Sequence, residues 1–368
     1  MTSLTIQTAD PVLPRQRRGP APGENTPPRL TTTVPRQYVH RASHAEVFLT
    51  SGERLDDTHF HLTAQWPRTH TFFTTNNTHH DPLQAAETIR QTGLYLAHTQ
   101  FNVPLDHHFL LWELNITTHP HPTPTHTTPH HHPTELTLHA TTPHTTRKGN
   151  RLTQFTMTVD IHQNHHLTAT GSGRFTCISP NTYKRLRPHT TPPPTTRPTH
   201  HLIPPTHTGR THPTDTVLTT TPHPHTYLLT PDPHHPILFE HTTDHYPGMV
   251  LLEAAQQATT HHTTTNTGNN SNSSNTNTNN SSNSSNDNSG NSNTNGGNGN
   301  GSSGPHTTTL NTTFHHYAEY HTPLHIHITP HPTTPNHTTT HTITGTQNNT
   351  TIFTTTHTHT TTPTQPTT

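Results

Sequence analysis

Two glutamates, Glu87 and Glu253, lie inside segments with helical spacing and are the residues best placed for acid–base chemistry. Glu253 follows Gly248 by five residues, so a helix that begins near the glycine places this acid about one turn in. Backbone N–H groups at such a helix start can polarise a carbonyl, helped by the positive end of the helix dipole. A carboxylate whose pKa is raised by burial can then accept a proton from an attacking hydroxyl. The alternative for each glutamate is a buried acid paired with a polar neighbour for packing alone.

The segments that hold these acids carry distinct helix signals. Asp81 and Pro82 supply an N-cap and a first-turn proline for a helix over 83–98. On its helical wheel the acid and Arg90 fall in the same stripe as leucines and alanines. Residues 245–258 are apolar nearly all round, which predicts a buried helix with a single acid.

Alternation of apolar and polar residues predicts antiparallel strands around these helices. The clearest hairpin has arms at 155–161 and 167–177, joined at Gln163-Asn164. A Thr/Pro/His-rich loop is expected over 119–146. Shorter strands or their approaches are expected at 34–36, 45–50, 109–114, 324–328 and 342–353.

The two helical segments repeat one another, because Glu87-Thr-Ile-Arg-Gln-Thr aligns with Glu253-Ala-Ala-Gln-Gln-Ala and alternating strands follow each. This repeat predicts an α+β double hotdog, in which two antiparallel sheets each wrap around a central helix. The expected parts are a disordered N-terminal segment at 1–30, a first hotdog domain at 31–187, a Pro/Thr/His-rich linker at 188–215, a second hotdog domain at 216–358 with an Asn/Ser-rich flexible insert at 264–304, and a disordered tail at 359–368.

The composition of the 368-residue chain limits its partners. Hydrophobic residues make up 23% and charged residues 10%, well below ordinary usage, so the apolar residues must be concentrated locally. With 18 basic and 19 acidic residues the chain has no uniform basic surface, and nucleic acid is not expected as a partner. Cys177 is the single cysteine, which excludes an intramolecular disulfide. No apolar run approaches the roughly 20 residues of a membrane span, so we expect a soluble, cytoplasmic protein without membrane contact.

The 45 histidines have a simpler explanation than metal binding. Thr, His, Pro, Asn and Gln can all be encoded by codons made only of A and C, so a skewed coding strand would enrich them together. Histidine tracts such as 119–122, 130–132 and 357–359 have no cysteine or carboxylate at ligand spacing. We therefore expect no bound metal and no other cofactor.

Seven segments, in this order along the chain, resemble the A-factor biosynthesis (AfsA-like) hotdog family and cover roughly a third of the residues. They are VPRQYVHRASHAEVFLT (34–50), AQWPRTHTFFT (64–74), HDPLQAAETIRQTGLYLAH (80–98), HHFLLWEL (107–114), GSGRFTCISPNTYKRLR (171–187), HPILFEHTTDHYPGMVLLEAAQQA (235–258) and FHHYAEYHTP (314–323). More distantly, residues 245–253 resemble the helix entry of β-hydroxyacyl carrier-protein dehydratases, where the proline-glycine and the acid recur.

The resemblance implies a γ-butyrolactone autoregulator synthase. Such an acyltransferase moves a β-ketoacyl group from a carrier-protein or coenzyme A thioester to the hydroxyl of dihydroxyacetone phosphate, and the ester closes by intramolecular aldol condensation to a phosphorylated butenolide. Two other classes stay open: a non-catalytic protein that binds acyl thioesters or butyrolactones, and a hotdog thioesterase or dehydratase that uses the same helix site.

Residue chemistry and resemblance together make Glu253 and Glu87 the candidate catalytic residues. The candidate substrate-binding residues are Arg90, Gln256, Arg68, His245 and Gly248. Arg90 is either the salt-bridge partner of Glu87 or a bidentate holder of the acceptor phosphate, and Arg68 is a phosphate candidate or a solvated loop arginine. The family usually carries arginine three residues after its second glutamate. Gln256 supplies no charge there, which predicts weaker transition-state stabilisation.

Overall fold

The strands form one 12-stranded antiparallel sheet within the residues that the computed structural model describes, which are 31–75, 79–120, 132–197, 201–240, 243–271 and 306–361. Its first six strands, in spatial order, are β1 (Leu49–Arg54), β2 (His59–Trp66), β6 (Thr134–Lys148), β7 (Arg151–Gln163), β8 (His166–Ile178) and β5 (His108–Thr118). The other six are β11 (His306–Phe314), β14 (Thr350–Thr361), β13 (Thr338–Gln347), β12 (His325–Pro330), β10 (Thr226–Leu229) and β9 (Leu218–Thr220). A separate small pair joins β3 (Thr74–Thr75) to β4 (His79–His80).

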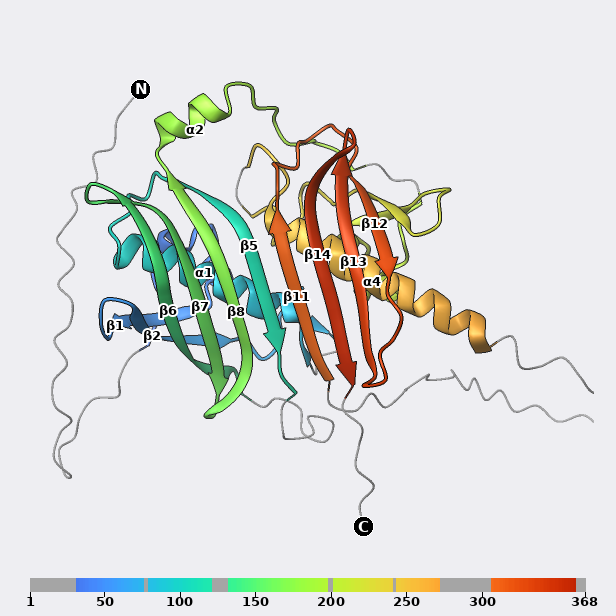
Figure 1. Cartoon of the computed structure of the whole chain (residues 1–368), viewed down its shortest axis with the longest axis horizontal. Helices are drawn as coiled ribbons and strands as arrows, with labels where there is room; N and C mark the ends of the chain where they lie inside the picture. The colour runs from blue at the N-terminus through green and yellow to red at the C-terminus, as the bar shows by residue number, and fades with distance from the viewer. Residues whose placement is uncertain are drawn as a thin grey trace, which may run out of the picture. The chain divides into compact units, whose positions relative to one another are not determined.

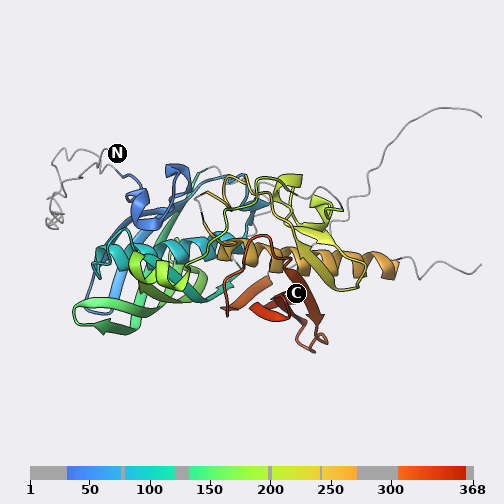
Figure 2. The same cartoon turned by 90° about the horizontal axis from the view of Figure 1, so that it is seen from above.

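The sheet consists of two equivalent halves that meet where β5 pairs with β11. Helix α1 (Pro82–Thr99) packs on β5, β7 and β8, and helix α4 (Gly248–Ser271) packs on β12, β13 and β14. Figure 1 shows both helices behind the sheet, and Figure 2 shows them following one another along it. This arrangement is the double hotdog that the repeat predicts, except that the two expected sheets are joined through β5 and β11 into one.

Helix α1 begins as its sequence predicts, because the Asp81 side chain accepts a hydrogen bond from Leu83 N at 2.8 Å and Pro82 occupies the first turn. The helix lies close on β8 at Gly171. A Cβ there would come within 2.2 Å of the Ile89 side chain and 2.6 Å of the Asn115 carbonyl oxygen. Glycine at this position therefore allows the close contact between helix and sheet.

Strand β7 confirms the predicted alternation, since Phe155, Met157, Val159 and Ile161 are all buried. In β8 the alternation holds from Ala169 on, but Leu167 near the turn is exposed. The corresponding strands of the second half bury fewer apolar side chains. In their place β11, β13 and β14 bury Thr312, Thr355, His341 and His357.

Several predicted elements differ from the structure. The loop expected over 119–146 is wrong from Thr134 on, where β6 buries Leu136, Leu138 and Ala140 at alternate positions. Thr, Glu and His occupy the positions next to these three apolar residues, and no further apolar residue continues the pattern toward Lys148, so the alternation in the sequence is short. The strand expected at 34–36 is replaced by a 3-10 helix, Arg36–Val39, and the strand expected over 342–353 is a hairpin of β13 and β14.

Two predicted boundaries also differ. The segment expected to be a linker at 188–215 contains the short helix α3 (Pro205–Thr208) and a 3-10 turn, Pro213–Asp215, with Thr208 and Asp215 buried. Helix α4 continues to Ser271, past the expected start of the insert at 264. The rest of that insert, the segment 1–30 and the end of the tail lie outside the described residues.

Candidate active site

A cavity of about 1250 Å³ opens where the two halves of the sheet meet. Apolar side chains from both halves line it, among them Leu94 of α1, Phe109 and Leu111 of β5, and Met249 and Leu251 of α4. Charged and polar lining residues include Arg41, Arg90, Lys184, Arg187, Asp244 and His245. The cavity thus combines apolar walls with four cationic side chains and the start of α4 at Gly248.

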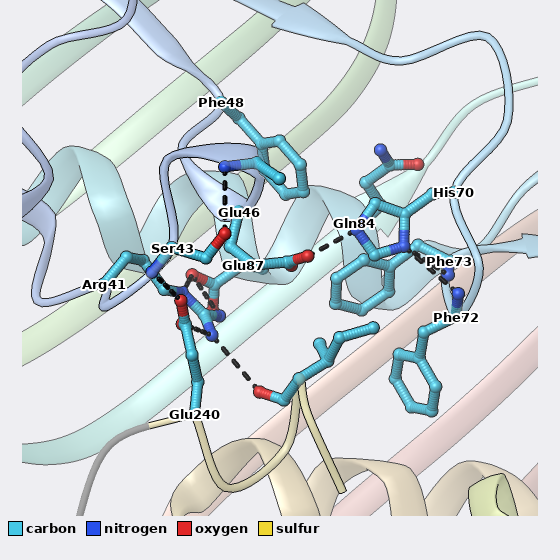
Figure 3. Close-up of polar contacts among 12 residues, drawn as sticks. Arg41, Ser43, Glu46, Phe48, His70, Phe72, Phe73, Gln84, Glu87 and Glu240 are labelled. Carbon is cyan, nitrogen blue, oxygen red and sulfur yellow. Dashed lines mark hydrogen bonds and ion pairs between the residues drawn. The ribbon is translucent and has the colours of Figure 1, made fainter.

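In the first half, Glu87 is fully buried, and Figure 3 shows it beside Arg41 and Glu240. Arg41 donates to its carboxylate from Nε at 2.9 Å, and Arg90 donates from Nε and Nη2 at 2.8 Å each. Gln91 donates from Nε2 at 2.8 Å, and Arg41 also contacts Glu240 at 2.6 Å. Burial alone would raise the pKa of Glu87, but the charges of Arg41 and Arg90 outweigh it and hold the pKa at about 2.

The second half repeats this network around Glu253 with one cation fewer. Arg210 donates to both Glu253 carboxylate oxygens, from Nε at 2.7 Å and from Nη2, and its Nη1 lies 2.8 Å from Asp81 Oδ2. Gln256 stands where Arg90 stands in the first half and donates to the same Asp81 oxygen at 2.9 Å. Burial raises the pKa of Glu253, and although Arg210 opposes the rise, Asp81 adds to it.

The two arginines also connect the halves. Arg41 Nη1 donates to the carbonyl oxygen of Ile237 at 3.2 Å, and Arg210 Nη1 donates to that of Phe72 at 2.8 Å. Phe72 and Ile237 are themselves equivalent, because each follows a buried histidine by two residues and donates its N–H to that ring. Each half therefore holds one loop of the other through a buried, hydrogen-bonded cation.

The structure brings some of the predicted site residues to the cavity and keeps others away. Arg90, His245 and Gly248 line it. Glu87 and Glu253 lie behind the lining with their carboxylates fully engaged, and Gln256 is equally absent from the lining. Arg68 is exposed and lies elsewhere. Arg90 is the salt-bridge partner of Glu87, as one of its two predicted roles requires. It also lines the cavity, so the second role, holding the acceptor phosphate, stays open to it. The catalytic role of the two glutamates stays a prediction.

Other residues of the site were missed from the sequence. Arg41 and Arg210 lie in matching segments, Val34-Pro35 to Glu46 and Ile203-Pro204 to Asp215, in which an arginine follows a residue with left-handed backbone. The match between the two segments could have indicated Arg210, but residues 188–215 were expected to be a linker because of their Pro/Thr/His-rich composition. Lys184, Arg187 and Asp244 carried no comparable signal, because only the fold brings them to the cavity.

Within the described parts of the chain, no group of three or more His, Cys, Asp or Glu residues is arranged to hold a metal ion. Among the same residues, no helix is long and apolar enough to cross a membrane.

The comparisons with known proteins give the family of this double hotdog. The model of the A-factor biosynthesis hotdog domain matches residues 24–179 and 192–272, and the chain belongs to this family. A relative from Streptomyces virginiae, named 2-oxo-3-(phosphooxy)propyl 3-oxoalkanoate synthase, is 40% identical over 229 residues, which cover 62% of this chain and 76% of the relative. A protein of the same name from Streptomyces griseus subsp. griseus is 30% identical over 240 residues, covering 65% of this chain and 75% of that protein.

Solved structures similar to the chain include the 12:0-ACP thioesterase from Umbellularia californica. The TM-score is 0.43 and the identity 7%, with 83% of this chain and 98% of that chain covered.

Proposed function

We propose that this protein transfers a β-ketoacyl group from a carrier-protein or coenzyme A thioester to the hydroxyl of dihydroxyacetone phosphate. The observation that carries the proposal is the cavity itself, whose wall joins apolar side chains to Arg41, Arg90, Lys184 and Arg187. An acyl chain needs the first kind of surface and a phosphate the second. The family and the names of its relatives agree with this substrate pair.

In this proposal the acyl chain lies against Leu94, Leu111 and Met249, and the reacting carbonyl lies near the start of α4. The first helical hydrogen bonds of α4 are donated by Val250 and Leu251 to the Pro247 carbonyl oxygen. The N–H groups of Gly248 and Met249 come before them and are the ones that a developing oxyanion could use. Arg90 and Lys184 are the proposed phosphate holders. Glu87 keeps the Arg90 guanidinium in place through two hydrogen bonds, which would limit the entropy lost when the acceptor binds.

The test is to incubate purified protein with a 3-oxoacyl thioester and dihydroxyacetone phosphate. We expect thiol release that depends on the acceptor, together with a phosphorylated ester detected by mass spectrometry. Dihydroxyacetone without its phosphate is the matched control and should react much more slowly. Thioester binding without any thiol release would favour the non-catalytic alternative, and acceptor-independent release would favour a thioesterase.

A further inference from the structure

An aspartate and a histidine that are neighbours in the sequence form a hydrogen-bonded pair on the cavity wall, three residues before α4 begins. His245 Nδ1 lies 2.6 Å from Asp244 Oδ1, and the His245 side chain is 27% exposed, toward the cavity that it lines. The ring is therefore held at one nitrogen and reachable from the space in which we place the substrates.

Asp244 is fixed by more than its histidine. Tyr183 donates its hydroxyl to Oδ1 at 2.6 Å, and Arg187 donates Nε to Oδ2 at 3.1 Å. Burial alone would raise the pKa of Asp244, but these donors and His245 hold it below its usual range. A carboxylate so held accepts hydrogen bonds only, so His245 Nδ1 must be the donor. In the neutral ring, Nε2 then carries the lone pair.

The surroundings of the pair suit a proton acceptor. The ring of Tyr317 meets that of His245 edge to face with centroids 4.8 Å apart, and His108 stacks on Tyr183 at 3.8 Å. Arg187 is also paired with Glu319, so the charge of this cation is shared between two carboxylates. The ring of His245 is thus oriented by packing as well as by hydrogen bonding.

We propose that His245 is the general base of the acyl transfer and that Asp244 is its positioning residue. This assignment rests on the proposed function. It follows from access, because His245 lines the cavity and its hydrogen bond within the described residues uses Nδ1, which leaves Nε2 for a substrate. The carboxylates of Glu87 and Glu253 instead lie behind the cavity wall with their oxygens already bonded to arginine. A base must lie within hydrogen-bond reach of the proton that it removes.

The acceptor hydroxyl gives its proton to His245 Nε2 while its oxygen bonds to the thioester carbonyl carbon. The tetrahedral intermediate then collapses, the C–S bond breaks and the imidazolium returns the proton to the departing sulfur. The products are the ester and the free thiol, and Asp244 stays ionised throughout.

The experiment compares His245→Ala with a matched control, His107→Ala. The chain contains the same Asp-His dipeptide at Asp106-His107, with Nδ1 and Oδ1 2.9 Å apart, but neither residue lines the cavity. We expect His245→Ala to lower kcat about 100-fold or more with little change in KM for the thioester, and added imidazole to restore part of it. His107→Ala should keep a kcat near that of the wild type. Asp244→Asn should lower kcat as well, since it removes the charge that orients the ring, without rescue by imidazole.

The outcomes separate the two proposals. An active wild type with an equally active, folded His245→Ala variant overturns the role of His245 and leaves the acyltransferase intact. If the wild-type protein hydrolyses the thioester and does not use dihydroxyacetone phosphate, the proposed acceptor is wrong. In that case, loss of the hydrolysis in His245→Ala would still support His245 as the general base. Loss of kcat without imidazole rescue, or an equal loss in His107→Ala, would show that the effect is structural and would overturn the proposal.

Discussion

Glu87 and Glu253 occupy equivalent places on α1 and α4, yet the charges around them do not balance in the same way. Around Glu87 there are two arginines, Arg41 and Arg90, and two carboxylates, because Glu240 joins the network. Around Glu253 a single arginine, Arg210, faces two carboxylates, its second partner being Asp81. The pKa shifts follow from this count, since the pKa of Glu87 is lowered and that of Glu253 is raised.

The two halves of this repeated fold therefore keep equivalent hydrogen bonds around their glutamates, although the balance of charges around each glutamate differs. Gln91 and Gln257 show the conserved part. Each donates to its glutamate and to the backbone carbonyl of an acid, Glu46 or Asp215, and each accepts from a backbone N–H. The position that changes is the one filled by Arg90 in the first half and Gln256 in the second. Only the first of these faces the cavity.

The largest expected effect comes from Glu87→Gln. This change leaves Arg41 and Arg90 facing Glu240 alone, and an uncompensated buried charge typically costs about 3–5 kcal/mol. Glu253→Gln is the matched control. It leaves one arginine facing one aspartate, so we expect it to cost less than about 1 kcal/mol. Denaturant unfolding of both variants near pH 7 measures the difference.

Equal losses in the two variants would show that the charge count does not govern stability. If Glu253→Gln folds normally and still loses kcat more than about 100-fold, Glu253 is the acid–base group that the sequence predicts. A loss of kcat in Glu87→Gln alone is also expected from the loosened Arg90 and does not make Glu87 that group.

A second expected effect is acid sensitivity of the second half, where His357 and His341 face one another across β13 and β14. Burial lowers the pKa of His357 to about 3 and, together with the charge of His262, that of His341 to about 4, from 6.5. The folded state then binds fewer protons than the unfolded state, so stability is complete above pH 6.5 and falls as the pH drops below it. At about pH 5.5, His357 alone should cost about 1.4 kcal/mol.

The measurement is the unfolding midpoint at about pH 7.5 and 5.5, with His357→Leu as the variant that should lose part of the dependence. Glu87 is not expected to contribute in this window. Its pKa is lowered from 4.5 to about 2, so its contribution is lost only as the pH falls below 4.5. A midpoint that is unchanged between the two pH values would contradict the assignment.

The fold was predictable from the sequence where alternation and helix caps are strong. Asp81-Pro82 and the hairpin of β7 and β8 show this, and the glutamate repeat gave the double architecture. Strand β6 was hidden because threonine and histidine fill positions next to its buried leucines. Arg210 was missed because its segment has a linker-like composition, although its hydrogen bonds are as buried as those of Arg41. Composition describes a segment's average, whereas a buried contact depends on a single residue.

A smaller effect is expected from Gln256→Arg, which introduces the charge that the second half lacks. Gln256 already lies 2.9 Å from Asp81, and its Oε1 is buried without a hydrogen-bond partner. An arginine there would face Asp81 and Glu253 and make charge-assisted hydrogen bonds, typically about 1.5–3 kcal/mol each before the desolvation of the guanidinium. We expect a net gain of about 1 kcal/mol in unfolding free energy.

Gln256→Arg also tests whether Glu253 takes part in the reaction. The sequence predicts that Gln256→Arg also raises kcat by restoring a charge beside Glu253. Because position 256 does not line the cavity, we expect the stability to rise more clearly than the rate. If Gln256→Arg lowers the free energy of unfolding, the second half does not need a further cation to balance Asp81 and Glu253. A large gain in kcat would instead indicate that Glu253 takes part in the reaction.

The smallest expected effect concerns the connection that follows each helix. Residues 100–107 join α1 to β5, whereas residues 272–305 join α4 to β11. Residues 272–304 contain no apolar side chain that a core would need. Removing residues 280–300 leaves enough chain to connect the two elements, and loop-closure entropy predicts a gain of only about 1 kcal/mol at most. Thermal unfolding and acyl transfer should therefore stay close to those of the full chain. A midpoint lowered by about 10 °C would mean that the segment packs on the second half, and this difference between the halves would then be structural.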